Sequence, residues 1–310
     1  MTILGMQTVP GQKIRISVPV PGSAPCEAIL LCGQKPGKTL VISAGVHGCE
    51  YVGILAAQRL RRELDLSRLC GQIILLPLVN PNGFYHAERQ IMPEDGKNLN
   101  REFPGHADGT YTQRLAAGIE QYIFPEADFL IDLHSGDWFE SLTPLVFFPI
   151  AAGDPVERAA RDAASCLSVP LRVASTARNG LYSRAAQLGI PSLLLERGCR
   201  AAWSEAELHA ELEDLYRLMA HLGMLEESAV RTTQREIRQA VYEEAPCRGF
   251  WYPQVQAGAQ LCAGQCLGFL TDAEGRMLCE YRAAFDGIVL YHTVILGVQE
   301  GDPLIAYGRT

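Results

Sequence analysis

TLVISAGVHGCE, residues 39–50, is the stretch around which this 310-residue chain is organised. Its apolar run over residues 40–42 is typical of a buried strand, and a glycine-containing turn ends it. His47 and Glu50 follow, and the helical spacing of apolar residues over 50–63 places Glu50 near a helix start. An imidazole and a carboxylate three residues apart after a buried strand are two ready ligands for a divalent metal ion.

Strands and helices alternate along the rest of the first two thirds of the chain. Strands are predicted over 12–20, 27–32, 72–79, 128–133, 144–149 and 190–195, helices over 50–63, 111–123, 155–167 and 203–225, and turns at 35–38 and 80–83. This alternation predicts an α/β fold with a mixed, mostly parallel sheet flanked by helices. From about residue 228, glycines and short apolar runs dominate. We therefore expect a catalytic domain over 1–228 and a small all-β barrel or sandwich over 229–310.

Three of the predicted strands lead to residues that bind metals or move protons. They lead to His47 with Glu50, to His134 and to Glu196. In open α/β sheets, sites form beyond the carboxyl ends of the strands, so these residues are expected to converge. Two histidines and a glutamate suit a catalytic zinc ion that keeps a fourth position for water. Glu196 is then the candidate general base for that water, and its alternative is a surface carboxylate paired with Arg197.

Residues 84–110 form a long polar segment with little periodicity, and a loop of this length inside a compact domain is usually functional. It carries Arg89, Asn100 and Arg101. Arginine binds carboxylates in a bidentate manner, and an adjacent asparagine adds an amide donor. A second arginine can stabilise the oxyanion of a tetrahedral intermediate, although loop arginines are often simply solvated. Asp132 shares a strand face with His134 and could orient it, or be an ordinary polar group of the sheet.

Six motifs occur in one order along the chain. They are HGCE (47–50), NPNGF (80–84), Arg89, DGKNLNREFPG (95–105), DLHSG (132–136) and ERG (196–198). Together, over about residues 35–225, they resemble the zinc carboxypeptidase-like superfamily, in its succinylglutamate desuccinylase/aspartoacylase branch. The β-rich region that follows also suits that branch. The family usually has an acidic residue where this chain has Cys49, at a position that is not a metal ligand.

The resemblance implies roles in metal binding, in carbonyl and carboxylate binding, and in proton transfer. The implied residues are His47, Glu50 and His134 as ligands of one zinc ion per chain, Arg89 as carbonyl polariser, Asn100 and Arg101 as the carboxylate clamp, and Glu196 as general base. The segment 179–189 resembles one that precedes the base in related bacterial deacylases, so Arg178 or Arg184 is expected to contact the acyl group. Peptidases of this superfamily also use a late tyrosine, for which Tyr182, Tyr252 and Tyr291 are the candidates.

Composition limits the partners that the protein can have. A net charge of −8 argues against non-specific binding to nucleic acid or to anionic membranes. We read no signal peptide at the N-terminus and no apolar run of the roughly 18 residues that span a bilayer, so a cytoplasmic protein with reduced cysteines is expected. Residues 249–310 contain no lysine, which excludes a lysine-borne cofactor there. We expect this region to form a lid or wall of the pocket, with oligomer contact as the alternative.

These observations predict a zinc-dependent amidohydrolase that removes the acyl group from an N-acyl amino acid or a similar small carboxylate-bearing amide. Two alternatives remain open: a metallocarboxypeptidase that acts on peptides, and a non-catalytic zinc or small-molecule binding protein of the same fold. The sequence does not identify the acyl group or the amino acid. It also leaves the oligomeric state open, a homo-oligomer included.

Overall fold

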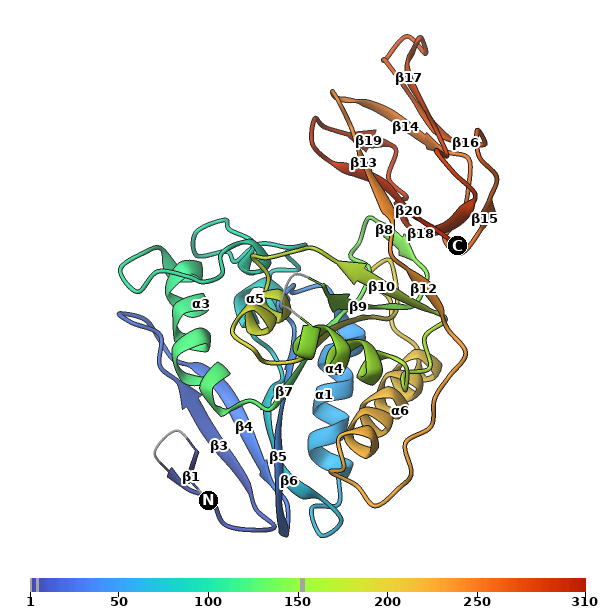
Figure 1. Cartoon of the computed structure of the whole chain (residues 1–310). Helices are drawn as coiled ribbons and strands as arrows, with labels where there is room; N and C mark the ends of the chain where they lie inside the picture. Colours follow the sequence, from blue (N-terminus) through green and yellow to red (C-terminus); the bar gives the residue numbers. More distant parts are fainter. Residues whose placement is uncertain (1, 4–5, 151–153) are drawn as a thin grey trace.

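A nine-stranded sheet forms the centre of the computed structural model, which describes residues 2–3, 6–150 and 154–310 (Figure 1). In spatial order its strands are β12 (Arg235–Ile237), β10 (Leu171–Ser175), β9 (Leu145–Pro149), β11 (Ser192–Glu196), β7 (Phe129–His134), β5 (Lys35–Ala44), β6 (Cys70–Leu76), β4 (Cys26–Cys32) and β3 (Lys13–Val18). Five of the eight neighbouring pairs are parallel, and those of β3 with β4, β4 with β6 and β9 with β11 are antiparallel. The predicted mixed, mostly parallel sheet is confirmed.

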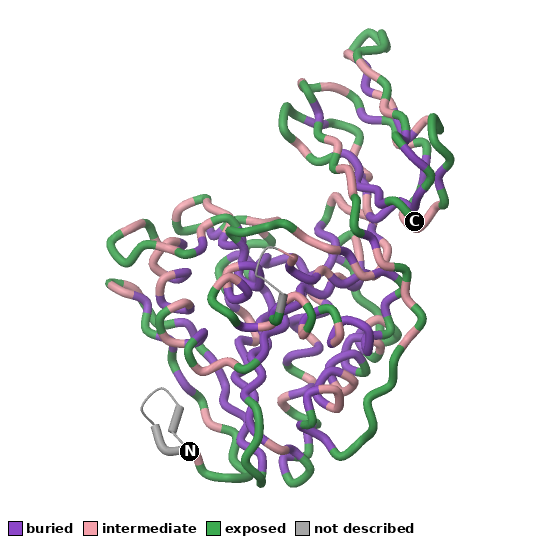
Figure 2. The backbone as a smooth tube through the Cα atoms, in the orientation of Figure 1, coloured by how far each residue is buried: buried purple, intermediate pink, exposed green. Residues whose placement is uncertain are grey.

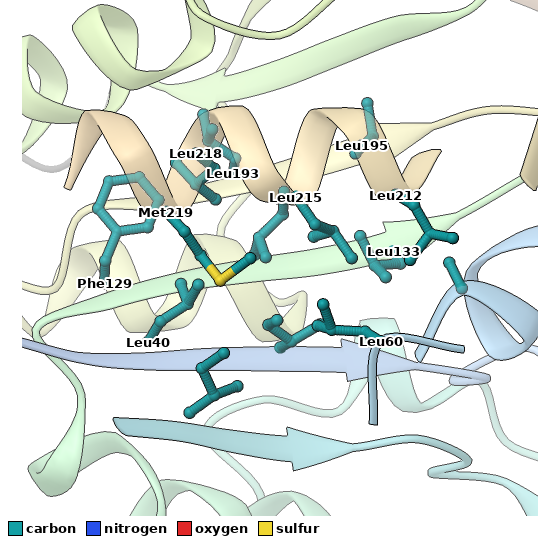
Figure 3. Packing of buried hydrophobic residues seen from close by; sticks show 14 of the residues in the cluster. Leu40, Leu60, Phe129, Leu133, Leu193, Leu195, Leu212, Leu215, Leu218 and Met219 are labelled. Carbon is teal, nitrogen blue, oxygen red and sulfur yellow. The ribbon is translucent and has the colours of Figure 1, made fainter. Parts of the chain in front are cut away.

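Helices cover both faces of this sheet. On one face lie α1 (Tyr51–Glu63), α4 (Asp154–Ala164) and α6 (Glu205–His221), and on the other lie α3 (Tyr111–Tyr122) and α5 (Leu181–Gln187). Side chains alternate between the two cores, because Leu40 and Ile42 of β5 face α1 and α6 whereas Val41 faces α3 and α5. Figure 3 shows part of the first core, with leucines of α6 packed against those of the strands.

The register of the parallel strands brings polar residues to one edge of the sheet. Ser43 of β5 lies opposite Asp132 of β7, and His134, the last residue of β7, lies opposite Glu196, the last residue of β11. The turn that carries His47 and Glu50 leaves β5 at the same edge and leads into α1. We call this edge, where β5, β7 and β11 end, the carboxyl edge.

The C-terminal part of the chain forms two antiparallel sheets with a core of their own around Trp251 and Tyr307. One contains β13 (Ala240–Glu244), β20 (Pro303–Arg309), β18 (Gly287–Thr293), β15 (Gln260–Leu261) and β8 (Glu140–Leu142); the other contains β17 (Met277–Arg282), β16 (Cys266–Thr271), β14 (Gly249–Pro253) and β19 (Gly297–Val298). The two parts of the chain share a sheet, because β8 comes from the segment between β7 and β9 and pairs with β18 (Figure 1). Residues 235–237 lie beyond the expected boundary at 228 and extend the large sheet as β12.

The turns predicted at 35–38 and 80–83 are not found; these segments belong to a strand and, from residue 81, to a short helix. Residues 35–38 belong to β5, where the register with β6 shifts between Lys35 and Thr39, so the extra residues are absorbed by a bulge. Residues 81–85 form the short helix α2 (Pro81–Tyr85). Asn80 caps it by accepting a hydrogen bond from the Gly83 amide at 2.8 Å, and proline suits the first helical position.

The remaining short elements are β1 (Thr2–Ile3), β2 (Met6–Gln7), η1 (Leu99–Arg101) and η2 (Phe124–Glu126). Buried residues concentrate in the large sheet and in the inner sides of its helices, whereas long connecting loops are exposed (Figure 2). None of the helices in the described part of the chain has the length and apolar character that a bilayer crossing requires.

Candidate functional site

His47, Glu50 and His134 meet at the carboxyl edge, as their positions after the strands predict. One potential ligand atom from each lies within 4.8 Å of the others, and all three residues are buried. The Glu50 carboxylate bridges the two imidazoles, with Oε1 at 2.7 Å from His47 Nδ1 and Oε2 at 2.7 Å from His134 Nδ1. Two nitrogens and a carboxylate therefore face one point, which is the donor set of a divalent metal site.

The turn that carries His47 requires its two glycines. Gly45 has φ +65°, in the left-handed region that residues with a side chain rarely adopt. Gly48 packs so closely on the 80–83 motif that a Cβ atom on Gly48 would lie 2.2 Å from the Gly83 carbonyl carbon. Cys49 is buried and bonds the Arg89 carbonyl oxygen at 3.4 Å. Burial raises the pKa of the Cys49 thiol to about 12, so Cys49 stays neutral and acts as a spacer.

The outer nitrogens of both histidines have acceptors. His47 Nε2 lies 3.2 Å from Asn98 Oδ1, and His134 Nε2 lies 3.0 Å from Asp132 Oδ2. The other oxygen of Asp132 accepts from the Ser43 hydroxyl at 2.7 Å, which fixes the carboxylate. Acceptors at Nε2 favour the tautomer with hydrogen on Nε2, and the Nδ1 lone pairs then point to the centre. The residues present fit a metal ion.

The charge distribution around the centre also favours a cation. Burial opposes ionisation of Glu50, but the two facing histidines lower the pKa of Glu50 to about 2. Burial would lower the pKa of His134, yet Asp132 and Glu50 hold the pKa of His134 well above its usual value. The buried carboxylates of Glu50 and Asp132 therefore favour a positive charge close by, and a bound metal ion would supply it without protonating either histidine.

A cavity of about 820 Å³ opens over this centre. Besides the three candidate ligands, the cavity is lined by further residues that the sequence singled out, among them Arg89, Asn100, Arg101 and Glu196. The long loop of residues 84–110 delivers the first three, and β11 delivers the fourth. Residues far apart in the sequence therefore share one space, as the motif order suggested.

Glu196 lies at the end of β11 beside His134, and its carboxylate has no hydrogen-bond partner among the described residues. Burial raises the pKa of Glu196 well above its usual value. His134 acts in the opposite direction, whereas Glu50, Glu140 and Asp132 raise this pKa further. A carboxyl group with a raised pKa beside a candidate metal site is a candidate for proton transfer.

Arg89 is held at the cavity wall by two neighbours. Its Nε donates to Asp137, and its guanidinium carbon lies 4.7 Å from the centre of the Phe139 ring. Its two terminal nitrogens have no partner among the described residues and can donate to a ligand. Asp137 and Phe139 were not predicted as site residues, although Asp137 directly follows the DLHSG motif.

Asn100 and Arg101 lie side by side in η1. Asn100 Oδ1 accepts from the Leu181 amide at 2.9 Å, and Asn100 Nδ2 lies 3.1 Å from His134 Nε2. The hydrogen bond from Leu181 fixes the orientation of the Asn100 amide group, and Asn100 lines the cavity. Arg101 contacts the Asn100 carbonyl oxygen at 2.9 Å and has no acidic partner among the described residues. An unpaired guanidinium next to an oriented amide donor is a binding arrangement for a carboxylate.

Arg178 and Arg184 lie outside the residues that line the cavity in the described structure. Arg178 is exposed, and Arg184 forms two hydrogen bonds with Glu120 at 2.8 and 3.0 Å. The ion pair with Glu120 of α3 holds the Arg184 side chain on that side of α5. The sequence does not reveal this pair, because 64 residues separate the partners.

Among the tyrosine candidates, Tyr182 and Tyr291 line the cavity and Tyr252 does not. Burial raises the pKa of both Tyr182 and Tyr291, so their hydroxyl groups stay protonated and can donate. Tyr242 of β13 and Glu140 of β8 are among the lining residues that were not predicted. Both lie on strands that the sequence pattern does not distinguish, since β8 is only three residues long.

Comparison with known proteins places the chain in a known family. Residues 36–222 match the model of the succinylglutamate desuccinylase/aspartoacylase catalytic domain. An N-alpha-acetyl-L-2,4-diaminobutyric acid deacetylase from Halomonas elongata is 26% identical over 278 residues, which are 86% of this chain and 81% of that protein.

Solved structures extend the likeness to the whole chain. The product-bound ectoine utilization protein EutE (DoeB) from Ruegeria pomeroyi superimposes with a TM-score of 0.86 at 23% identity, covering 98% of each chain. A succinylglutamate desuccinylase/aspartoacylase from Rhodobacter sphaeroides superimposes with a TM-score of 0.83 at 25% identity, covering 96% of this chain and 94% of the other. The matched residues include most strands of the large sheet and the candidate metal ligands His47, Glu50 and His134. On this evidence the chain belongs to the succinylglutamate desuccinylase/aspartoacylase family.

Proposed function

We propose that this protein is a zinc-dependent amidohydrolase that removes the acyl group from a small N-acyl amino acid or a related carboxylate-bearing amide. The observation that carries the proposal is one cavity shared by the His47–Glu50–His134 centre, the Glu196 carboxyl group and the Asn100–Arg101 pair. Membership of the desuccinylase/aspartoacylase family supports it, as does a relative named as an N-acetyl diamino acid deacetylase.

His47, Glu50 and His134 are the residues that would hold the zinc ion, through two Nδ1 atoms and a carboxylate oxygen. Three protein ligands are the number found in catalytic zinc sites. When bound, zinc lowers the pKa of a coordinated water to about 7 and polarises a carbonyl group. Asn98 and Asp132 keep the two imidazoles in the orientation and tautomer that this binding requires.

Glu196 moves the proton. In its carboxylate form it accepts a proton from the attacking water and returns that proton to the leaving nitrogen as the amide C–N bond breaks. The raised pKa of Glu196 suits both transfers, since a catalytic group is most effective when its pKa lies near the working pH.

The arginines position the substrate and stabilise its developing charge. Arg89 presents two terminal nitrogens toward the carbonyl oxygen, where negative charge builds as the water attacks. Arg101 and the Asn100 amide bind the carboxylate of the amino acid and hold the scissile bond over the metal centre. Asp137 and Phe139 keep the Arg89 side chain in place.

Two variants and a substrate panel test this function. We expect His47→Ala to lose bound zinc, and Glu196→Gln to keep zinc while its turnover falls by roughly 100-fold or more. Zinc is measured by metal analysis, and turnover on a panel of N-acyl amino acids with the chelated protein as blank. Glu213→Gln, on the exposed face of α6, is the matched control. Full activity in Glu196→Gln would contradict the assigned base, and a wild-type protein inactive on the whole panel would contradict the function.

A further inference from the structure

Glu140 lines the catalytic cavity but takes no part in the proposed reaction. It is the first residue of β8 and lies opposite Thr293 of β18. Tyr291, two residues from Thr293 and on the same face of β18, also lines the cavity. In the described part of the chain, the Glu140 carboxylate has neither an ion-pair partner nor a hydrogen bond. It is therefore available to a ligand.

Most other charges in the cavity are already balanced. Arg89 is paired with Asp137, and Arg238 donates to Glu236 at 2.6 Å. The metal centre accounts for Glu50, and the proposed reaction uses Glu196. Close to the metal centre, Arg101 has no acidic partner and Glu140 has no basic partner among the described residues.

The surroundings of Glu140 favour a positive ligand. Burial, followed by the nearby charges of Asp137 and Glu50, raises the pKa of Glu140 to about 8. A carboxylate in such a position is stabilised by a cation placed beside it. Glu243 and Glu244 of β13 also line the cavity and add to its negative potential. The same potential repels a second carboxylate, so a substrate with an acidic side chain is disfavoured.

We propose that Glu140 is a specificity-determining residue that binds an ammonium group on the substrate, so that the preferred substrate is an N-acyl diamino acid. The carboxylate of this substrate binds Arg101, its free side-chain ammonium group binds Glu140, and its amide lies at the metal centre between them. This inference rests on the proposed deacylase function and specifies which side chain the amino acid carries.

The test compares three substrates that differ in side-chain charge: N-α-acetyl-L-2,4-diaminobutyrate, the similarly sized uncharged N-acetyl-L-norvaline, and the acidic N-acetyl-L-aspartate. We expect the wild-type protein to prefer the cationic substrate. In Glu140→Gln, the ratio of kcat/KM for the cationic over the uncharged substrate falls by roughly 10- to 100-fold, as expected for losing a charged hydrogen bond. Glu140→Lys shifts the preference toward N-acetyl-L-aspartate.

A binding measurement provides a readout independent of turnover. Calorimetry with the zinc-loaded protein compares the affinities for the products L-2,4-diaminobutyrate and L-norvaline. We expect Glu140→Gln to lower the affinity for L-2,4-diaminobutyrate and to leave that for L-norvaline unchanged. Glu300→Gln removes the same charge at an exposed position outside the cavity lining and is the control. Its ratio of kcat/KM is expected to match that of the wild type.

The outcomes separate this inference from the proposed function. Equal losses on the cationic and uncharged substrates in Glu140→Gln would show a structural or catalytic role and overturn the inference. A wild-type protein that hydrolyses the uncharged or acidic substrate best would also overturn it, while the deacylase function stands. If no substrate is hydrolysed, the proposed function fails, and the calorimetric comparison still decides whether Glu140 selects an ammonium group.

Discussion

Asp132 lies directly behind His134, one of the proposed zinc ligands. Its carboxylate is fully buried, accepts from Ser43 at 2.7 Å and faces His134 Nε2 at 3.0 Å. We expect Asp132→Asn to weaken zinc binding by roughly 10- to 100-fold, because the imidazole loses the acceptor that fixes its tautomer and raises its basicity. Competition with a chromogenic chelator measures the affinity.

Asp128→Asn is the matched control for Asp132→Asn. Asp128 precedes the same strand at its other end, where it accepts from the Thr39 amide at 2.8 Å, far from the metal centre. We expect it to leave zinc affinity unchanged. Wild-type affinity in Asp132→Asn would show that His134 needs no support from this carboxylate.

Gly48 joins two motifs that are remote in sequence. A Cβ atom at this position would lie 2.2 Å from a backbone atom of Gly83, and backbone cannot move aside cheaply. We expect Gly48→Ala to lower the free energy of unfolding by about 1–3 kcal/mol, the usual range for overpacking. Urea unfolding measures this, with Gly297→Ala as control because its site has open space and no positive φ. Equal stabilities of the two variants would contradict the close contact.

The sequence predicted those site residues that directly follow recognisable buried strands or lie in recognisable motifs. The convergence of His47, Glu50 and His134 is confirmed as a candidate metal-binding cluster. Asn98 and Glu140 were missed, because their positions depend on how the long loop and β8 fold back over the sheet edge. Asn98 lies within the DGKNLNREFPG motif, but that motif does not show which of its polar residues faces His47, and no motif includes Glu140.

At the scale of elements, a buried charge network ties β11 to α6 behind the candidate base. Arg197 follows β11 and donates to Asp214 of α6 at 2.5 Å, while its Nε lies 3.6 Å from Glu211. Neither carboxyl oxygen of Glu211 has a hydrogen-bond partner in the described structure. Burial raises the pKa of Glu211 to about 8, although Arg197 acts to lower it. Glu211 is therefore the member of this network whose burial is least balanced by hydrogen bonds and opposite charge.

The raised pKa of Glu211 predicts a pH-dependent stability. The pKa of Glu211 is near 4.5 in the unfolded chain and about 8 in the folded protein. Between these pH values the folded protein binds the Glu211 proton more tightly than the unfolded chain does, so the free energy of unfolding falls as pH rises. One proton corresponds to a slope of about 1.4 kcal/mol per pH unit. We expect Glu211→Gln to remove this slope and to gain stability relative to the wild type as pH rises from 5 to 8. Denaturant unfolding across this range, with Glu213→Gln as control, measures it; parallel wild-type and Glu211→Gln curves would contradict it.

Elements with strong local signals were predicted, and those stabilised mainly by distant partners were not. The helix α6 has the predicted Ser204 cap, whose hydroxyl accepts from the Glu207 amide at 3.2 Å. In contrast, β8 is three residues long and pairs with β18, about 150 residues further along the chain. The segment 35–38 contains proline and glycine and was predicted as a turn, but pairing with β6 keeps it extended.

At the scale of the whole molecule, the C-terminal part closes one side of the cavity. Tyr242 of β13 and Tyr291 of β18 line it, with their ring centres 6.4 Å apart. The β8–β18 pairing joins this wall to β8, the strand that follows the candidate metal ligand His134. We expect a wall in this position to restrict the length of a bound substrate and so to favour small amides over peptides.

Removing part of this wall is expected to broaden the range of substrates. Tyr242 is 51% exposed, so Tyr242→Ala sacrifices little buried surface while it widens the cavity. We expect kcat/KM for a long-chain acyl amino acid, relative to the N-acetyl compound, to rise by roughly 10-fold, the scale of discrimination for one or two methylene groups in a pocket. Tyr252→Ala is the matched control, because Tyr252 is 38% exposed and lies outside the lining. If the wild-type protein already trims long peptides as efficiently as small amides, the wall does not restrict the substrate, and a carboxypeptidase becomes the better description of this site.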